Sequence, residues 1–452
     1  MKTTGNSTTA ILTAAMILLA STVALGQHNA EVQFQLPSEI LLGERLSIRL
    51  SGMPPKAIVR IEAARITGKT PKLHHAAITV QADANGVVDL SKQAPMPSTD
   101  SSYSGIEPLG LLWSMKPTAN ADAAVEKPEQ DLVTFTAGIE QQGSFVEAAK
   151  YEINLQSCLP DVEECAFGNQ QDFEGTFLMM RPTDKPLPVI ITLGGSEGGD
   201  MSARRTAPGL ASRGFAVVGF PYYSPAYYPE EAQFPSLPQA FQEIPLERLE
   251  ALVKLIDEHP QLDGSRIGLH GVSKGAEYVL ASSSKLDRFQ AVAAIVPSDV
   301  IWEGWGTNRK TSSFSYQGEA LPFVPYKGMQ EAIKQLQQGK PASIRIPQDA
   351  GRAANPDTVP AARIRVENIK APLMIVGGDK DRTWDSGGMC RNIVATRKSA
   401  GLSTQAWISE DAGHYLSGHA YNPMPNQRAN ASLRTKTYPA MLEFFKGHLL
   451  AD

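Results

Sequence analysis

A serine framed by two glycines stands in the stretch GVSKG, residues 271–275 of the chain. A serine held in a tight Gly-x-Ser-x-Gly turn is the nucleophile of many hydrolases. The five-residue pattern is weak evidence alone, because with 37 glycines in 452 residues it arises by chance in roughly one such chain in five. The residues around Ser273 must therefore decide whether it does chemistry.

The flanking residues favour a strand over 266–270 and a helix over 276–282, which places Ser273 in the turn between them. Backbone N–H groups at such a turn can stabilise the oxyanion that forms when the hydroxyl attacks an acyl carbon. We expect one donor from Lys274 and the other from Gly195 or Ser196, in LGGSEGG at 193–199. A phosphate-binding loop is the alternative for this stretch, but it matches neither the P-loop nor the dinucleotide motif.

A serine nucleophile needs a base and an orienting carboxylate, and both follow downstream. Asp381 lies just past an apolar strand in GGDKDRTW, and His414 lies in SEDAGHYL before the last helix. The rival acid is Asp379 and the rival base is His419. The order Ser, Asp, His is that of the α/β-hydrolases, so the sequence predicts a Ser273–Asp381–His414 triad.

Residues 156–452 contain the elements that would position these side chains. Five apolar strands alternate with helical segments: PLPVIITLGG, GFAVVGFPYY, SRIGLHG, AVAAIVP and APLMIVGG. This alternation predicts an α/β domain with a mostly parallel sheet covered on both faces. Residues 298–366 interrupt the pattern and are expected to form a cap insertion over the site, the alternative being a solvent-exposed excursion.

Residues 27–155 differ in pattern, with short alternating strands between Gly, Pro, Asn and Asp clusters. They predict an all-β, immunoglobulin-like sandwich. His74 and His75 are adjacent, so on a strand they point to opposite faces and cannot share a metal. Because no His, Asp and Glu cluster has ligand spacing, we expect no metal and no other cofactor.

The N-terminus predicts export. An apolar run from about residue 10 to 25 precedes Ala24-Leu25-Gly26, so 1–26 are expected to be a signal peptide and the protein periplasmic or secreted. A membrane anchor is the alternative. In an oxidising compartment Cys158 and Cys165 could form a disulfide, with Cys390 left over, although three ordinary thiols would fit equally well.

The charge of the chain restricts its partners. Its formal net charge of −5 means that it has no excess of positive charge with which to bind nucleic acid or an anionic membrane, so the expected partner is a small molecule. No stable membrane insertion is expected after signal cleavage. Basic residues near the motifs, such as Arg204, Arg205 and Lys274, are expected to be solvated surface charges.

The chain as a whole resembles the acyl-CoA thioester hydrolase and bile acid-CoA:amino acid N-acyltransferase family. The resemblance is carried by YSGIEPLGLLWSM at 103–115, LGGSEGG, ASRGFAVVGFPYY at 211–223, PLERLEALVKLIDEHP, IGLHGVSKGAE and GGDKDRTW. It implies a β-sandwich followed by an α/β-hydrolase domain. It also implies Ser273 as nucleophile, Asp381 as acid, His414 as base, and an acyl thioester or ester as substrate.

Two departures from the family pattern bear on function. The amidating members resemble this chain but have cysteine as nucleophile, so Ser273 favours transfer of the acyl group to water over transfer to an amine. The signal peptide would make the chain a secreted member and favour an ester, thioester or amide other than a CoA thioester. The other readings are an acyltransferase, a carboxylesterase, lactonase or peptidase, and a secreted binding protein with an inert hydrolase domain.

Overall fold

The computed structural model describes residues 31–68, 70–118, 126, 128–141, 144–169, 171–226, 231–340 and 342–450. The predicted signal peptide lies outside these residues. Two compact units are present, one made of 31–38 and 46–154 and the other of 39–45 and 155–450. The short segment 39–45, which the sequence analysis assigned to the first domain, therefore belongs to the second unit. No helix in the described ranges is long and apolar enough to cross a membrane.

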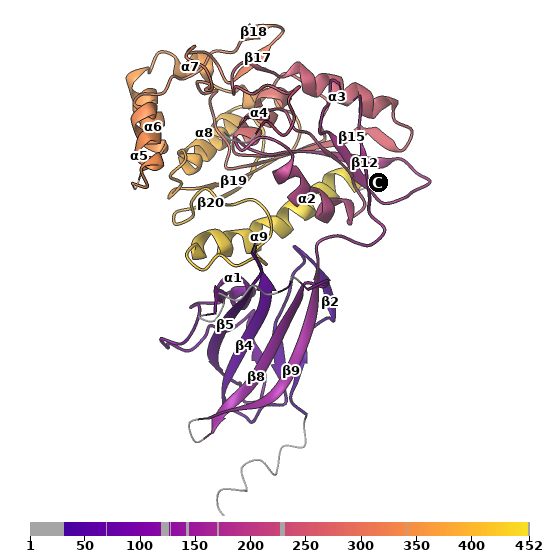
Figure 1. Ribbon diagram of the computed structural model, residues 1–452, viewed down its shortest axis with the longest axis vertical. Coiled ribbons are helices and arrows are strands. Elements are labelled where there is room, and N and C mark those ends of the chain that lie inside the picture. Colours follow the sequence, from indigo (N-terminus) through magenta and orange to yellow (C-terminus); the bar gives the residue numbers. More distant parts are fainter. Residues whose placement is uncertain are drawn as a thin grey trace, which may run out of the picture. The chain divides into compact units, whose positions relative to one another are not determined.

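The first unit is built from two antiparallel sheets (Figure 1). One has the order β1-β3-β6 and the other β9-β8-β4-β5-β7, while β2 lies in the segment 39–45 of the second unit. The rings of Phe34 on β1 and Phe135 on β8 lie 6.1 Å apart, so the sheets pack face to face. An immunoglobulin-like strand arrangement remains a prediction. The strands are β1 Gln33–Gln35, β2 Glu39–Leu41, β3 Arg49–Ser51, β4 Ile58–Thr67, β5 Lys72–Gln81, β6 Val88–Asp89, β7 Lys116–Pro117, β8 Leu132–Gln141 and β9 Ser144–Gln156, with the short helix α1 Gly110–Trp113.

The second unit contains an eight-stranded sheet of order β10-β11-β13-β12-β15-β16-β19-β20. The strands from β13 to β20 run parallel, whereas β10 and β11 are antiparallel, so the prediction of a mostly parallel sheet is confirmed. The five predicted apolar strands are β12 Leu187–Leu193, β13 Ala216–Gly219, β15 Leu262–Val272, β16 Ala291–Ile295 and β19 Leu373–Gly378. The sequence analysis missed β10 Glu163–Ala166, β11 Phe177–Met180 and β20 Gln405–Ser409. The end strands β10 and β20 lack an apolar run because they are largely exposed.

Helices cover both faces of this sheet (Figure 1). Helices α2 and α9 pack on one face, against side chains such as Ile190 and Met374. Helices α3, α4 and α8 pack on the other face, against side chains such as Ile191 and Ile375. Successive side chains of one strand therefore point to opposite faces of the sheet and are buried on both. This explains why the strands are continuous apolar runs. The helices are α2 Met201–Ala211, α3 Glu247–Glu258, α4 Lys274–Ser283, α8 Ser386–Ser399 and α9 Arg428–Phe445, the last continued by η2 Lys446–Leu450.

The insertion predicted at 298–366 lies between β16 and β19. Its side chains include Trp302 and Phe314, which are almost completely buried, so it is not a solvent-exposed excursion. The insertion contains the helices α5 and α6, which lie side by side (Figure 1). The elements are β17 Phe314–Tyr316, β18 Glu319–Ala320, α5 Met329–Gln337, α6 Arg345–Ala354, α7 Val359–Ala362 and η1 Val366–Asn368, and β17 also pairs with β14 Ile244–Pro245.

All three cysteines are unpaired, so of the two alternatives for Cys158 and Cys165 the structure has free thiols. Cys165 lies on β10 opposite Leu178 and is exposed. Cys158 accepts a hydrogen bond from the Ser212 hydroxyl at 3.7 Å. The two thiols are therefore held by different elements, which sequence spacing could not reveal.

A buried histidine on β15 predicts a loss of stability in mild acid. Burial lowers the pKa of His270 from 6.5 to about 4, and its Nδ1 contacts the Thr192 hydroxyl at 3.0 Å. Between these pH values the unfolded chain binds a proton that the folded chain does not, so stability falls as the pH drops from about 6.5 to about 4, by roughly 3 kcal/mol. Urea unfolding across this range should show the slope in the wild type and a smaller one in His270→Gln. Equal slopes would refute this assignment.

Candidate active site

Ser273 lies at the end of β15, where α4 begins. Its backbone has φ 55° and ψ −119°, a region that a non-glycine residue seldom adopts. Both flanking glycines are required by close contacts. A Cβ on Gly271 would lie 2.3 Å from the Gly275 carbonyl oxygen, and one on Gly275 would lie 2.1 Å from that of Gly194. The turn therefore presents the serine at the carboxyl edge of the sheet, as the sequence predicted.

The structure brings the three predicted side chains together. The Ser273 Oγ lies 3.0 Å from His414 Nε2, and His414 Nδ1 lies 2.8 Å from Asp381 Oδ2. The other carboxylate oxygen of Asp381 accepts the backbone N–H groups of Thr383 (2.8 Å) and Trp384 (3.3 Å). The carboxylate is therefore fixed and can orient the imidazole so that Nε2 faces the hydroxyl.

The rival residues lie elsewhere. Asp379 forms a two-point ion pair with Arg391, at 2.7 and 2.8 Å, which lowers the pKa of Asp379. His419 Nδ1 accepts the Tyr421 N–H at 3.3 Å.

The structure separates the two upstream candidates for an oxyanion donor, Gly195 and Ser196. Gly195 donates its N–H to Glu197 Oε1 at 3.0 Å, so this donor is already engaged. The same oxygen accepts the Ser202 hydroxyl, which fixes the carboxylate. Of the two upstream donors considered, Ser196 is left, and it lines the same pocket as Ser273 and Lys274. Lys274 is the first residue of α4, where N–H groups lack intrahelical acceptors.

A pocket of about 460 Å³ opens over Ser273. This volume is within the usual range for a small-molecule site. Helices α5 and α6 of the insertion form one wall, and the loop at 304–310 forms another. The lining residues are Ser196, Ser273, Lys274, Glu303, Gly304, Trp305, Gly306, Thr307, Asn308, Arg309, Lys310, Tyr326, Gly328, Met329, Gln330, Ile333, Ile344, Gln348, Thr383 and Trp384.

Lys274 is buried rather than solvated, which overturns the sequence expectation. Its ammonium donates to Glu277 Oε2 at 2.7 Å and to the Ser313 hydroxyl at 2.9 Å. It also lies over the rings of Phe241, Phe314 and Trp305, 5.0, 5.2 and 5.7 Å from their centroids. Burial lowers the pKa of Lys274 and raises that of Glu277, and their mutual attraction opposes both shifts.

The buried pair also joins α4 to the insertion. Glu277 Oε1 accepts the Trp302 N–H at 3.1 Å, and the Ser313 hydroxyl donates to the Trp302 carbonyl at 2.9 Å. The helix that starts at Ser273 is thereby tied to both ends of the loop that lines the pocket. By contrast, Arg204 is a half-exposed surface group paired with Asp200 and Glu164.

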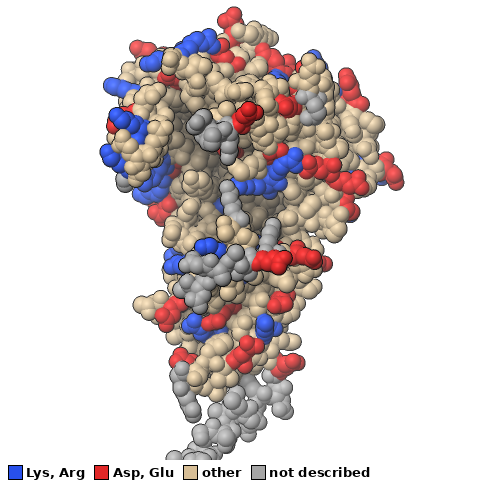
Figure 2. Space-filling model, in the orientation of Figure 1, with Lys and Arg blue, Asp and Glu red and all other residues tan. Residues whose placement is uncertain are grey.

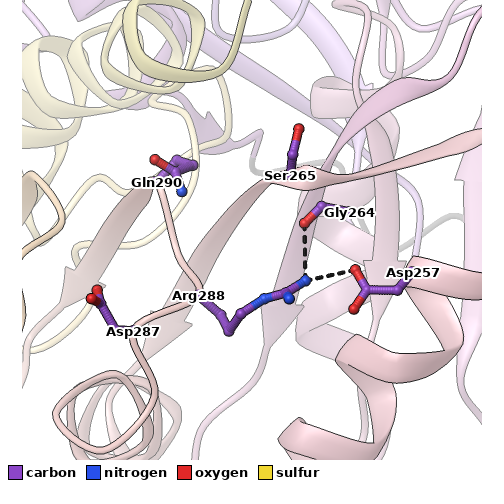
Figure 3. Close-up of a pocket in the computed structure, with 6 residues that line it drawn as sticks. All are labelled: Asp257, Gly264, Ser265, Asp287, Arg288 and Gln290. Carbon is purple, nitrogen blue, oxygen red and sulfur yellow. Dashed lines mark hydrogen bonds and ion pairs between the residues drawn. The ribbon is translucent and has the colours of Figure 1, made fainter.

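A second depression lies at the other end of β15 (Figure 3). Arg288 donates there to Asp257 at 2.6 Å and to the Gly264 carbonyl at 3.2 Å. Ser265 is eight residues before Ser273 on this strand, which corresponds to roughly 25 Å. The depression is therefore separate from the triad, at the amino edge of the sheet. No group of three or more His, Cys, Asp or Glu in the described chain could hold a metal.

Three residues of the site were missed by the sequence analysis. Glu277 stands three residues after Lys274, a spacing that places the two on one face of a helix and could have indicated the pair. Glu197 lies within the quoted LGGSEGG motif but received no role. Gln348 lies in the insertion and carries no local signal, because only folding brings α6 to the pocket.

The mostly parallel sheet, its covering helices and the serine turn define the α/β-hydrolase class. Two family models match the chain: "Acyl-CoA thioester hydrolase/BAAT N-terminal region" over 43–154 and "BAAT / Acyl-CoA thioester hydrolase C terminal" over 244–439. The chain belongs to this acyl-CoA thioester hydrolase/BAAT family.

Known proteins similar to the chain carry two kinds of name. Mitochondrial acyl-coenzyme A thioesterase 2 of Rattus norvegicus is 26% identical, with 86% of this chain and 79% of the relative covered. Acyl-coenzyme A amino acid N-acyltransferase 1 of Mus musculus is 24% identical, with 92% and 97% covered. A solved Pyrococcus furiosus esterase is 16% identical with a TM-score of 0.37, covering 61% of this chain and 88% of the esterase.

Proposed function

We propose that the protein is a serine hydrolase that cleaves an acyl thioester or ester through an acyl-enzyme intermediate. The observation that carries the proposal is the chain of contacts from Asp381 through His414 to Ser273, at the floor of a pocket of about 460 Å³. An inert binding protein would have no need for this alignment.

In the first half of the proposed reaction, Ser273 Oγ attacks the acyl carbon as His414 Nε2 takes its proton. The negative charge that develops on the acyl oxygen is held by the backbone N–H groups of Ser196 and Lys274. The bond to the leaving group then breaks, and His414 gives its proton to the departing thiolate or alkoxide. Ser273 is left carrying the acyl group.

In the second half, His414 removes a proton from water, whose oxygen attacks the acyl-enzyme. Collapse of the second tetrahedral intermediate releases the carboxylic acid and returns the proton to Ser273 Oγ. Asp381 holds the imidazole in the productive tautomer and stabilises its positive charge while it carries the proton.

The charge of the insertion supports a substrate with an anionic part. The insertion at 298–366 contains nine basic and six acidic side chains, although the whole chain has a net charge of −5. Figure 2 shows Lys and Arg side chains gathered over the region of α5 and α6. Lys310 lines the pocket and forms no ion pair recorded for the described residues. A phosphate-bearing thiol such as coenzyme A, named for the relatives, would meet this charge.

The experiment that tests this function measures hydrolysis by the purified mature protein on matched acyl-CoA thioesters and oxygen esters of several chain lengths. Release of free acid with both substrates, or with thioesters alone, would support the proposal. Activity on oxygen esters alone would remove the thioesterase assignment and leave a serine esterase. Absence of hydrolysis with every substrate would refute the proposal.

Two finer points belong to the same proposal. The acyltransferase alternative is tested by adding glycine to the assay, since an N-acylated product would show that an amine competes with water. We favour hydrolysis because a serine stands at the nucleophile position.

Export through residues 1–26 is also proposed, and mass determination of the protein from a secreting host should show a chain that begins at Gln27.

A further inference from the structure

Gln348 is a buried polar side chain that the proposed reaction does not use. It lies on α6 with 4% of its surface exposed, and it lines the pocket over Ser273. Its Oε1 is buried without a hydrogen-bond partner, and no hydrogen bond of its amide is recorded among the described residues. Buried amides are nearly always hydrogen-bonded, so an unpartnered one requires an explanation.

The position of Gln348 is fixed relative to the triad. Arg345, one turn earlier on α6, donates its Nη1 to the carbonyl oxygens of Asp379 (3.0 Å) and Asp381 (3.2 Å). The Arg345 N–H also donates to the Arg382 carbonyl at 3.1 Å. Residues three apart share one face of a helix, so the anchor that holds α6 to the acid loop also places Gln348 at the pocket.

Part of the wall of the pocket that Gln348 lines is apolar. Met329 and Ile333 come from α5, Ile344 precedes α6, and Trp384 lies beside the acid. A few polar groups in such a wall usually orient a ligand and select it. The terminal torsion of a glutamine side chain rotates at little cost, so either the amide oxygen or the amide nitrogen can face the pocket.

We propose that Gln348 recognises a neutral hydroxyl or amide group on the substrate and makes the enzyme prefer acyl substrates that carry one. This inference rests on the proposed hydrolase function. The group lies either on the acyl chain or on the leaving group. In both places it would form a hydrogen bond with the Gln348 amide, for which the described residues supply no partner. A substrate without such a group leaves the amide unpaired when it fills the pocket, which lowers the rate.

The test compares two matched substrate pairs. The acyl arm uses 4-nitrophenyl hexanoate against its 3-hydroxy and 6-hydroxy derivatives. The leaving-group arm uses hexanoyl-N-acetylcysteamine, which carries an amide, against the S-pentyl thioester of hexanoic acid. In one arm the wild type should prefer the polar member by about tenfold or more in kcat/KM. Gln348→Met should reduce that preference at least tenfold, mainly by lowering the rate on the polar member.

Two controls separate recognition from folding. The Tm of Gln348→Met should be no lower than that of the wild type, because the amide has no partner to lose. Should that variant fail to fold, Gln348→Asn, which shortens the side chain, should show the same loss of preference. Gln338→Met, an exposed position at the end of α5 outside the pocket lining, should keep the wild-type preference.

The outcomes distinguish this inference from the function beneath it. Hydrolysis with no preference for a polar member in either arm would overturn the recognition proposal and leave the hydrolase intact. The same holds if Gln348→Met folds and keeps the wild-type preference. Absence of hydrolysis with every ester and thioester would refute the proposed function, and the recognition proposal with it.

Discussion

Ser273→Ala should lower kcat/KM about 10⁴- to 10⁶-fold on the best ester or thioester found for the wild type. The reason is the loss of the Ser273 oxygen, which lies 3.0 Å from His414 Nε2, the nitrogen placed to take its proton. The residual rate would come from the pocket and from the backbone donors at Ser196 and Lys274, which the substitution leaves in place. Steady-state kinetics on the purified variant would measure the effect.

A fluorophosphonate probe gives an independent measurement, since it forms a covalent bond to an activated serine oxygen. Intact-mass analysis should show one adduct on the wild type and none on Ser273→Ala. The matched control is Ser399→Ala, which removes an exposed hydroxyl on α8 whose partner is the Ala395 carbonyl. It should keep both activity and labelling. Labelling of the Ser273→Ala variant to the wild-type extent would exclude Ser273 as the nucleophile.

Lys274→Met should destabilise the fold by about 3 to 5 kcal/mol, because it leaves the Glu277 carboxylate buried without its counter-ion. The loss should depend on pH. Burial raises the pKa of Glu277 above its ordinary value of 4.5, and removing the lysine raises it further. The unfolded chain then loses this proton at a lower pH than the folded chain does. The stability of the variant should therefore fall as the pH rises above about 4.5.

The double variant Lys274→Met/Glu277→Gln tests this explanation. It removes both charges and keeps an acceptor for the Trp302 N–H, so it should recover much of the lost stability and lose the extra pH dependence. Urea unfolding at pH 5 and pH 8 would measure both effects in the two variants and the wild type. A double variant as unstable as the single one would show that Lys274 acts through packing against Phe241 and Phe314, not through charge.

The sequence predicted most of the catalytic unit because its signals are local. Apolar runs gave five strands of the parallel sheet, and the glycines around Ser273 marked a turn where larger side chains would collide with backbone. Asp381 could be chosen because it follows an apolar strand of a sheet whose carboxyl ends meet at one edge, and His414 because it lies in a Gly-His loop before the last helix. The exposed end strands were missed because strands with little to bury have no apolar pattern.

Other expectations failed because they depended on contacts between distant segments. The solvated lysine is buried by Ser313 and three aromatic rings, two of them from the insertion. Spacing left Cys158 and Cys165 open as a disulfide or as two thiols, and the structure has free thiols, with Cys158 beside Ser212 and Cys165 on β10.

The sequence by itself therefore determined the class of fold, the order of nucleophile, acid and base, and the family to which the chain belongs. Only the tertiary structure decided which atoms meet at the site. It joined the buried Lys274–Glu277 pair to the insertion, and it set the unpartnered amide of Gln348 in the pocket wall. The physical reason is that burial and hydrogen bonding depend on segments far apart in the chain. Strands, turns and motifs, by contrast, can be predicted from residues that are close together in the sequence.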